Sequence, residues 1–314
     1  MLTRRHLRIK VLQTLYSFYQ DGEGDAGKAE KELFFSIDKM EEMYVYLLQM
    51  VVEMQGAAID KIEQGRNKQL PSKEDLHPNT KFVTNRPLRV LANSKTLKNK
   101  REDISVSWAD DLDLVKKVFK MLIETDDYKE FMESEERGFD HDKEFLLRFL
   151  KRHIINYPQL HDYFEEKSIF WNDDLDLIAS MTLKTIKSIN EDSDDVELLP
   201  LWKPEDDEKD FVTTLFRKSL ADAEENELVI NEFTKNWELD RIAMMDTILM
   251  KMAIAEARTI SSVPIKVTMN EYIELSKYYS TPKSNGFING VLDQAFAKLE
   301  NDGLIKKTGR GLMQ

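Results

Sequence analysis

Apolar residues recur at intervals of three and four along most of the chain, which is the spacing of one helix face. Residues 4–20 predict a first helix, and the glycine-rich run at 21–27 ends it because glycine has poor helix propensity. Residues 30–64 keep the spacing without a break and predict a long amphipathic segment, which we expect to form a helix pair. The apolar face of the first helix consists of Leu7, Val11, Leu15 and Phe18.

The C-terminal part of the chain predicts three further helices. An apolar stripe over residues 240–258 predicts the first of them, and Pro264 follows it as a helix breaker. Thr268 and Glu271 have the spacing of a capping box, so the second helix should begin at Thr268. The third should end at Gly303, because glycine is the favoured residue just after a helix C-terminus.

A seven-residue motif occurs twice in the middle of the chain. Trp-Ala-Asp-Asp-Leu-Asp-Leu at 108–114 returns as Trp-Asn-Asp-Asp-Leu-Asp-Leu at 171–177. In each copy the aspartates precede an apolar helical pattern, where acidic side chains favour the positive end of a helix. We therefore expect duplicated helical hairpins with Trp108 and Trp171 as core anchors, and a fainter third copy around Trp237.

The composition agrees with packed helices. The 314 residues include only 11 Gly and 8 Pro, which is too few for a turn-rich β fold, so we expect an all-α protein. Cysteine is absent, which excludes disulfides and thiolate chemistry. No apolar run is long enough to span a membrane, and the basic N-terminus does not have the apolar core of a signal peptide. We expect a cytoplasmic protein.

The net charge of -13 is unevenly distributed. Residues 1–20 contain four basic side chains and no acidic one, and residues 65–103 contain ten basic and four acidic ones. Residues 104–210 carry 29 acidic and 14 basic side chains. Exposed charges separated by more than about 10 Å are largely screened at ordinary salt, so a local basic surface can bind a polyanion on an acidic protein. The overall charge therefore does not exclude RNA.

The usual signatures of enzymatic chemistry are missing. No phosphate-cradling glycine loop and no histidine pair with metal-binding spacing occurs. The Asp-rich runs are better explained as helix starts than as a metal cluster. Ser280 and Lys283 mimic one motif of penicillin-binding proteins, but the Ser-Asp-Asn motif that should follow is missing. We expect no enzymatic activity, no cofactor and no metal site.

Two C-terminal stretches carry a family resemblance. Residues 263–277 read Val-Pro-Ile-Lys-Val-Thr-Met-Asn-Glu-Tyr-Ile-Glu-Leu-Ser-Lys, and residues 287–293 read Phe-Ile-Asn-Gly-Val-Leu-Asp. Both resemble the NusB family of transcription antitermination factors at the same internal spacing. The arginine-rich residues 4–8, followed by Gln-Thr-Leu-Tyr at 13–16, are similar to the first helix of that family.

The resemblance implies a non-enzymatic RNA-binding adaptor. Its fold would be a NusB-like helical bundle, enlarged here by additional helical hairpins. Its partners would be boxA-type single-stranded RNA of ribosomal RNA transcripts, the ribosomal protein NusE and the RNA polymerase antitermination complex, and a homodimer is compatible with the resemblance. The RNA-binding residues that it implies are Arg4, Arg5, His6, Arg8, Lys283, Phe287 and Asn289, and the partner-binding residues are Tyr16 and Asp246.

The resemblance also predicts how the chain is divided into parts. Residues 1–20 would be the RNA-binding helix of the core and 207–304 the rest of the core, with a basic tail at 305–314. Residues 21–206 would form a helical insertion, with a loop-rich basic segment at 65–103 and an acidic part at 104–206. Two alternatives stay open at this point: a helical protein–protein scaffold without RNA binding, and an accessory module related to RNA methyltransferases.

Overall fold

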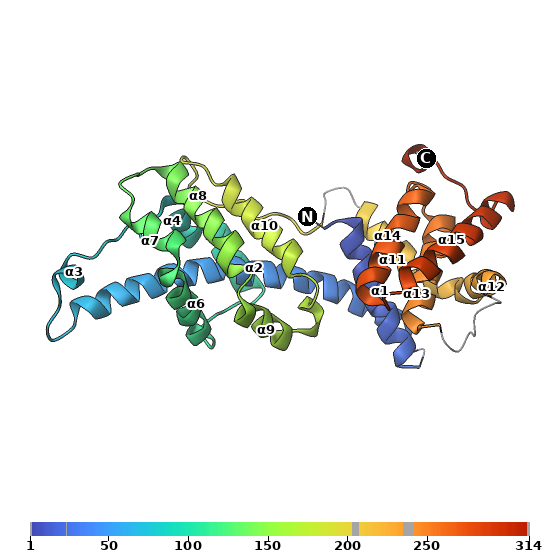
Figure 1. The fold of residues 1–314 in the computed structure, drawn as a ribbon, viewed down its shortest axis with the longest axis horizontal. Helices are drawn as coiled ribbons and strands as arrows, with labels where there is room; N and C mark the ends of the chain where they lie inside the picture. The colour runs from blue at the N-terminus through green and yellow to red at the C-terminus, as the bar shows by residue number, and fades with distance from the viewer. Residues whose placement is uncertain (1, 23, 203–206, 235–241, 313–314) are drawn as a thin grey trace. The chain divides into compact units, whose positions relative to one another are not determined.

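The computed structural model describes residues 2–22, 24–202, 207–234 and 242–312. Every regular element in these ranges is a helix and none is a strand, which confirms the expected all-α class (Figure 1). The chain forms two compact units. The terminal unit comprises Leu2–Ile37 and Trp202–Gln314, and the middle unit comprises Asp38–Leu201.

Helix α13 (Met244–Thr259) is the centre of the terminal unit. It is apolar on almost all sides and packs against five other helices, as expected for a helix without a solvent face. These neighbours are α1 (Arg4–Gln20), α11 (Asp207–Ala221), α12 (Ala223–Phe233), α14 (Ile265–Tyr279) and α15 (Ser284–Asn301).

Helices α1 and α14 run in the same direction, opposite to α13. Near the end of α13, Glu256 accepts hydrogen bonds from Arg8 of α1 and Thr268 of α14. Near its start, the Met244 sulfur lies 3.6 Å from the Gln20 amide at the end of α1. The starts of α1 and α14 therefore lie at one end of the terminal unit, and the turn between α14 and α15 lies at the other.

The expected end of the last helix is confirmed. Gly303 has a φ of +69°, and the Leu304 N–H donates to the Leu299 carbonyl oxygen at 2.9 Å, which is the Schellman arrangement. The tail beyond it folds back, and the Thr308 N–H donates to the Ser261 carbonyl oxygen at 3.1 Å. Gly311 lies so close to the same loop that an added Cβ would be 1.9 Å from that oxygen.

The middle unit is arranged around α2 (Ala26–Arg66), whose first part belongs to the terminal unit. The expected helix pair at residues 30–64 is wrong, because α2 is one continuous helix of 41 residues. The unit adds α3 (Lys73–Leu76), α4 (Arg86–Asn93), α5 (Lys95–Asp103), α6 (Leu112–Glu124), α7 (Asp126–Glu133), α8 (Phe139–Phe149), the π-helical turn η1 (Leu150–Ile154), α9 (Pro158–Lys167), η2 (Ile169–Trp171) and α10 (Leu175–Ser188).

The duplicated motif attaches both copies to α2. Trp108 and Trp171 are buried, and their indole N–H groups donate to the backbone oxygens of Tyr46 at 3.0 Å and Lys39 at 2.7 Å. Both indoles also contact the Tyr46 ring edge to face. The expectation that they are core anchors is confirmed, whereas Trp237 lies outside the described residues.

The basic segment at 65–103 is more regular than expected. It contains α3, α4 and α5, and Phe82, Leu88, Leu91 and Leu97 within it are buried. Pro87 does not disrupt α4 because it occupies the first turn, where no backbone N–H is required. Among the described helices, none is long and apolar enough to cross a membrane.

Candidate nucleic-acid interface

An open groove of about 740 Å³ lies where α1 and α14 begin. Thr3 and Pro264 are the residues before the two helices, and neither helix has an acidic residue in its first turn or a side-chain cap. The first N–H groups of both helices therefore lack intrahelical partners and carry the positive end of the helix dipole. This terminal groove is lined by Thr3, Arg4, Arg5, His6, Arg8, Ser262, Val263, Pro264, Val267 and Glu271.

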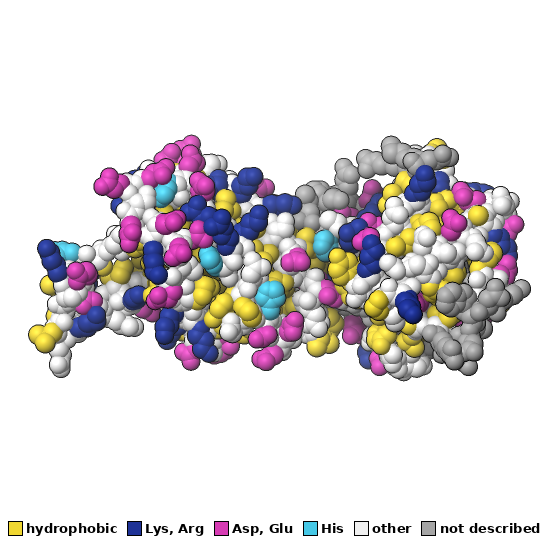
Figure 2. Space-filling view, in the orientation of Figure 1, with side chains coloured by type: hydrophobic (Ala, Val, Ile, Leu, Met, Phe, Trp, Pro, Cys, Tyr) yellow, Lys and Arg dark blue, Asp and Glu magenta, His cyan; other side chains and the backbone are white. Residues whose placement is uncertain are grey.

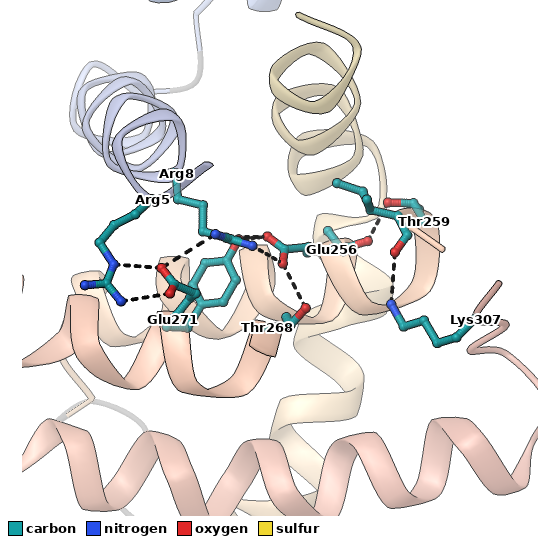
Figure 3. Close-up of polar contacts among 10 residues, drawn as sticks. Arg5, Arg8, Glu256, Thr259, Thr268, Glu271 and Lys307 are labelled. Atoms are coloured by element: carbon teal, nitrogen blue, oxygen red, sulfur yellow. Dashed lines mark hydrogen bonds and ion pairs between the residues drawn. The ribbon is translucent and has the colours of Figure 1, made fainter. Parts of the chain in front are cut away.

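Arg5 is exposed and held by Glu271. Its Nε and Nη2 donate to the two carboxylate oxygens, each at 2.8 Å (Figure 3). Burial alone would raise the pKa of Glu271, but the hydrogen bond from Arg5 and the charges of Arg8 and Arg5 outweigh it and hold the pKa below its usual value. The pair fixes the guanidinium in one orientation and leaves the Nη1 donors for a ligand.

Arg8 belongs to a buried network beneath the groove. Only 2% of Arg8 is exposed, and its Nε and Nη2 donate to Glu256 at 2.7 Å each. Thr268 and Tyr272 donate to the same carboxylate at 2.8 and 3.0 Å, so Glu256 is fully satisfied (Figure 3). The expectation that Arg8 contacts RNA directly is therefore revised. Its guanidinium joins α1 to α13 and does not reach solvent.

Arg4 and His6 complete the basic side of the groove. Both are half-buried, and the Arg4 guanidinium lies 5.0 Å from the centre of the Phe211 ring in a cation–π contact. The Nδ1 atom of His6 lies 2.7 Å from the Thr3 hydroxyl. Burial lowers the pKa of His6, and the positive charge of Arg5 lowers it further, so the ring is neutral at neutral pH.

The capping-box prediction at Thr268 is wrong. Helix α14 begins one turn earlier, at Ile265, because the proline before it already has the extended conformation of an N-cap. Glu271 therefore does not cap the helix, and its carboxylate pairs with Arg5. Sequence reasoning also missed Glu256, although an acidic residue within the otherwise apolar residues 252–257 indicates a buried cation partner.

The other predicted site residues lie at the opposite end of α14, roughly 20 Å away by helix rise. Lys283 and Asn289 are exposed, Phe287 is half-buried, and Tyr16 is 38% exposed. Asp246 is buried, which revises its expected place on a partner surface.

Asp246 holds the turn between α14 and α15. It accepts hydrogen bonds from the hydroxyl groups of Ser280 and Ser284, the latter at 2.7 Å. The structure thus brings Arg4, Arg5 and His6 together and places Lys283, Phe287 and Asn289 in a separate patch. Within the described residues, no group of acidic or histidine side chains could hold a metal ion.

The chain was compared with known proteins. The model of the NusB family matches residues 175–297, which run from the start of α10 into α15. The chain carries a NusB family domain. Transcription antitermination protein NusB of Salinibacter ruber is 44% identical over 105 residues, which are 33% of this chain and 66% of the relative. The protein of the same name from Chloroherpeton thalassium is 40% identical over 105 residues, which are 33% of this chain and 50% of the relative.

The NusB match is partial on both sides. The protein of the same name from Natranaerobius thermophilus is 33% identical over 89 residues, which are 28% of this chain and 64% of the relative. The chain therefore spans half to just under two thirds of these relatives. Most of the middle unit lies outside the family match, and so does α1, although α1 packs against α11 and α13. No solved structure matches the chain at a significant level.

Proposed function

We propose that this chain is a non-enzymatic transcription antitermination factor that binds boxA-type single-stranded RNA of ribosomal RNA transcripts. The observation that carries the proposal is the terminal groove, where two helix starts and two arginines converge and which is partly lined by residues of the NusB family match. Relatives that bear the name transcription antitermination protein support the same general function. Binding needs no covalent chemistry, and the protein acts through assembly.

The groove can hold a phosphate through three kinds of donor. The first N–H groups of α1 and α14 attract an anion. Arg5 adds its remaining donors in an orientation that Glu271 has already fixed, and Arg4 adds a second guanidinium. Phosphate contacts of this kind position the RNA and make its affinity dependent on salt.

The distant patch extends the same proposal. Lys283, Phe287 and Asn289 would contact a second part of the RNA strand, with Phe287 as a surface on which a base can stack. Tyr16 lies at this end of the unit and would face NusE. Asp246 acts indirectly, because it fixes the turn from which Lys283 projects. RNA polymerase would be reached through the assembled complex of RNA and NusE.

Fluorescence anisotropy with a boxA-like RNA, with and without NusE and across a salt series, tests the proposal. The double variant Arg4→Gln/Arg5→Gln should bind on the order of tenfold more weakly and reduce the log–log salt slope by about 1.4, because each phosphate contact on single-stranded RNA contributes about 0.7. NusE should strengthen binding by the wild-type chain.

The matched control is Lys28→Gln/Lys31→Gln, which removes two exposed charges from the same unit at positions away from the groove. It should bind like wild type. Equal and weak binding by all three proteins, with no effect of NusE, would contradict the proposal and favour a helical scaffold without RNA binding.

A further inference from the structure

The middle unit contains a second basic groove, of about 490 Å³, between α8 and α10. Its lining holds five cationic side chains and one carboxylate. Figure 2 shows Lys and Arg side chains gathered over these two helices. This middle groove is lined by Glu144, Leu147, Arg148, Lys151, Arg152, Ser180, Leu183, Lys184 and Lys187.

The cations form two facing rows. Lys151 and Arg152 of η1 lie three and four positions after Arg148 of α8. Lys184 and Lys187 lie three positions apart on α10. Side chains at these intervals project from one face of a helix with Cβ atoms about 5–6 Å apart. The rows therefore line the two sides of the groove with positive charge.

The row on α8 and η1 includes a π-helical turn, and Asp127 holds its two arginines. The Ile155 N–H donates to the Leu150 oxygen at 3.1 Å, five residues back, so η1 is a π-helical turn, a rare feature that is frequent at functional sites. Asp127 accepts hydrogen bonds from Arg152 at 3.1 Å and His153 at 2.8 Å, and it lies 3.0 Å from the Arg148 Nε atom. The two arginines are thus fixed in place.

The lysines of the groove are not neutralised in this way. Lys151, Lys184 and Lys187 are exposed, and none of them forms an ion pair with any other residue in the described part of the chain. An anion can therefore bind them without displacing a carboxylate.

The surroundings direct a polyanion to this groove. Within the middle unit, residues 104–201 carry 24 acidic and 12 basic side chains, and the groove gathers five of those basic ones. The other charged side chains of this segment are mostly acidic and repel a polyanion. The electrostatic potential therefore favours binding at the groove over the rest of the segment. The half-buried side chains of Leu147 and Leu183 form an apolar part of its lining against which a sugar can pack.

We infer that the middle groove is a second RNA site, which binds the sugar–phosphate backbone of single-stranded RNA without sequence preference. A positively charged groove that follows the backbone is the usual form of such a site. The described lining contains no aromatic side chain, so bases are not read by stacking. The choice of RNA as the polyanion rests on the proposed function, whereas the groove itself belongs entirely to the middle unit.

The test measures anisotropy of a labelled single-stranded oligouridylate with the full chain across a salt series. The groove variant Lys151→Glu/Lys184→Glu/Lys187→Glu should bind on the order of tenfold more weakly, with a log–log salt slope reduced by about 2 for three lost phosphate contacts. The control Lys95→Glu/Lys98→Glu/Lys117→Glu makes the same change of charge at exposed positions of the same unit and should bind like wild type. Circular dichroism checks that both variants fold.

The outcomes separate this inference from the proposed function. Loss of boxA binding in Arg4→Gln/Arg5→Gln reports on the terminal groove, and loss of oligouridylate binding in the lysine variant reports on the middle groove. Equal losses in the lysine variant and its control, or no loss in either, would overturn the second site. Binding of polyglutamate that the lysine variant loses, while its oligouridylate binding is unchanged, would assign the groove to an acidic protein and overturn the RNA assignment.

Discussion

The two basic grooves hold their cations in different ways. In the terminal groove, Arg5 is fixed by a bidentate carboxylate and Arg8 is withdrawn into a buried pair. In the middle groove, Asp127 holds Arg148 and Arg152, but Lys151, Lys184 and Lys187 are exposed and have no ion-pair partner among the described residues. Fixed arginine forks suit recognition of a defined geometry, whereas exposed lysine charges on flexible side chains tolerate many positions of a phosphate. The difference predicts a selective site in one unit and a tolerant one in the other.

The largest effect should come from breaking the buried pair of the terminal unit. Arg8→Met leaves the Glu256 carboxylate buried without its cation and should lower the free energy of unfolding by about 3–5 kcal/mol. Urea unfolding followed by near-ultraviolet circular dichroism measures the change. The double variant Arg8→Met/Glu256→Gln should recover part of the loss, because it removes the unpaired charge and keeps an amide oxygen that can accept from the hydroxyl groups of Thr268 and Tyr272. A loss below about 1 kcal/mol in the single variant would show that the pair does not hold α1 to α13.

A smaller effect should follow from detaching the C-terminal tail. Gly311→Ala places a Cβ 1.9 Å from the Ser261 oxygen, so the tail must leave the loop that leads into the terminal groove. The hydrogen bond between the Thr308 N–H and Ser261 is then lost, and stability should fall by about 1 kcal/mol. Thermal unfolding measures the loss, and Gly286→Ala serves as control because nothing lies within 4 Å of a Cβ there. Equal melting temperatures for the two variants would contradict the tight packing of the tail.

The contrast between arginine and lysine can be tested directly. Arg5→Lys keeps the charge but removes the bidentate fork, and boxA affinity should fall by roughly threefold to tenfold. The reciprocal change Lys151→Arg/Lys184→Arg in the middle groove should leave oligouridylate affinity unchanged. Equal responses of the two grooves in anisotropy titrations would remove the distinction between them.

The smallest predicted effect concerns pH. The pKa of His6 lies below 6.5, so the folded chain binds fewer protons there than the unfolded chain, and this group withdraws a little stability as pH falls through that range. A bound phosphate favours the protonated ring, so boxA affinity should rise as pH falls below 6.5. Titrations of wild type and His6→Gln between neutral and mildly acidic pH measure this. The same rise in the variant would exclude His6 as its source.

Helical spacing was sufficient to predict the all-α class and some of the helix ends. It predicted both ends of α1 and the glycine that terminates the last helix, because both depend on local pattern and local propensity. It did not predict that α2 is a single helix or that residues 65–103 are largely helical. The candidate sites were less accessible. Arg8 and Glu256 are 248 positions apart, and no local rule distinguishes the buried arginine from the exposed one three residues earlier.

The middle groove shows the same limit of sequence reasoning. Its two rows come from helices separated along the chain, and each row alone resembles an ordinary solvated helix face. The π-helical turn continues directly from α8, and helical spacing alone did not distinguish it from an ordinary helix. The charge count indicated only that basic residues are scarce in residues 104–210. It did not indicate that five of them line one groove.

The tryptophan contacts along α2 set the spacing between the two motif copies. The two motif copies attach to backbone oxygens at Lys39 and Tyr46, seven residues and thus about 10 Å apart along the helix. This separation is about two helical turns, so both tryptophans meet nearly the same face of α2. Inserting two residues between Lys39 and Tyr46 would turn one attachment point by about half a turn away from its tryptophan.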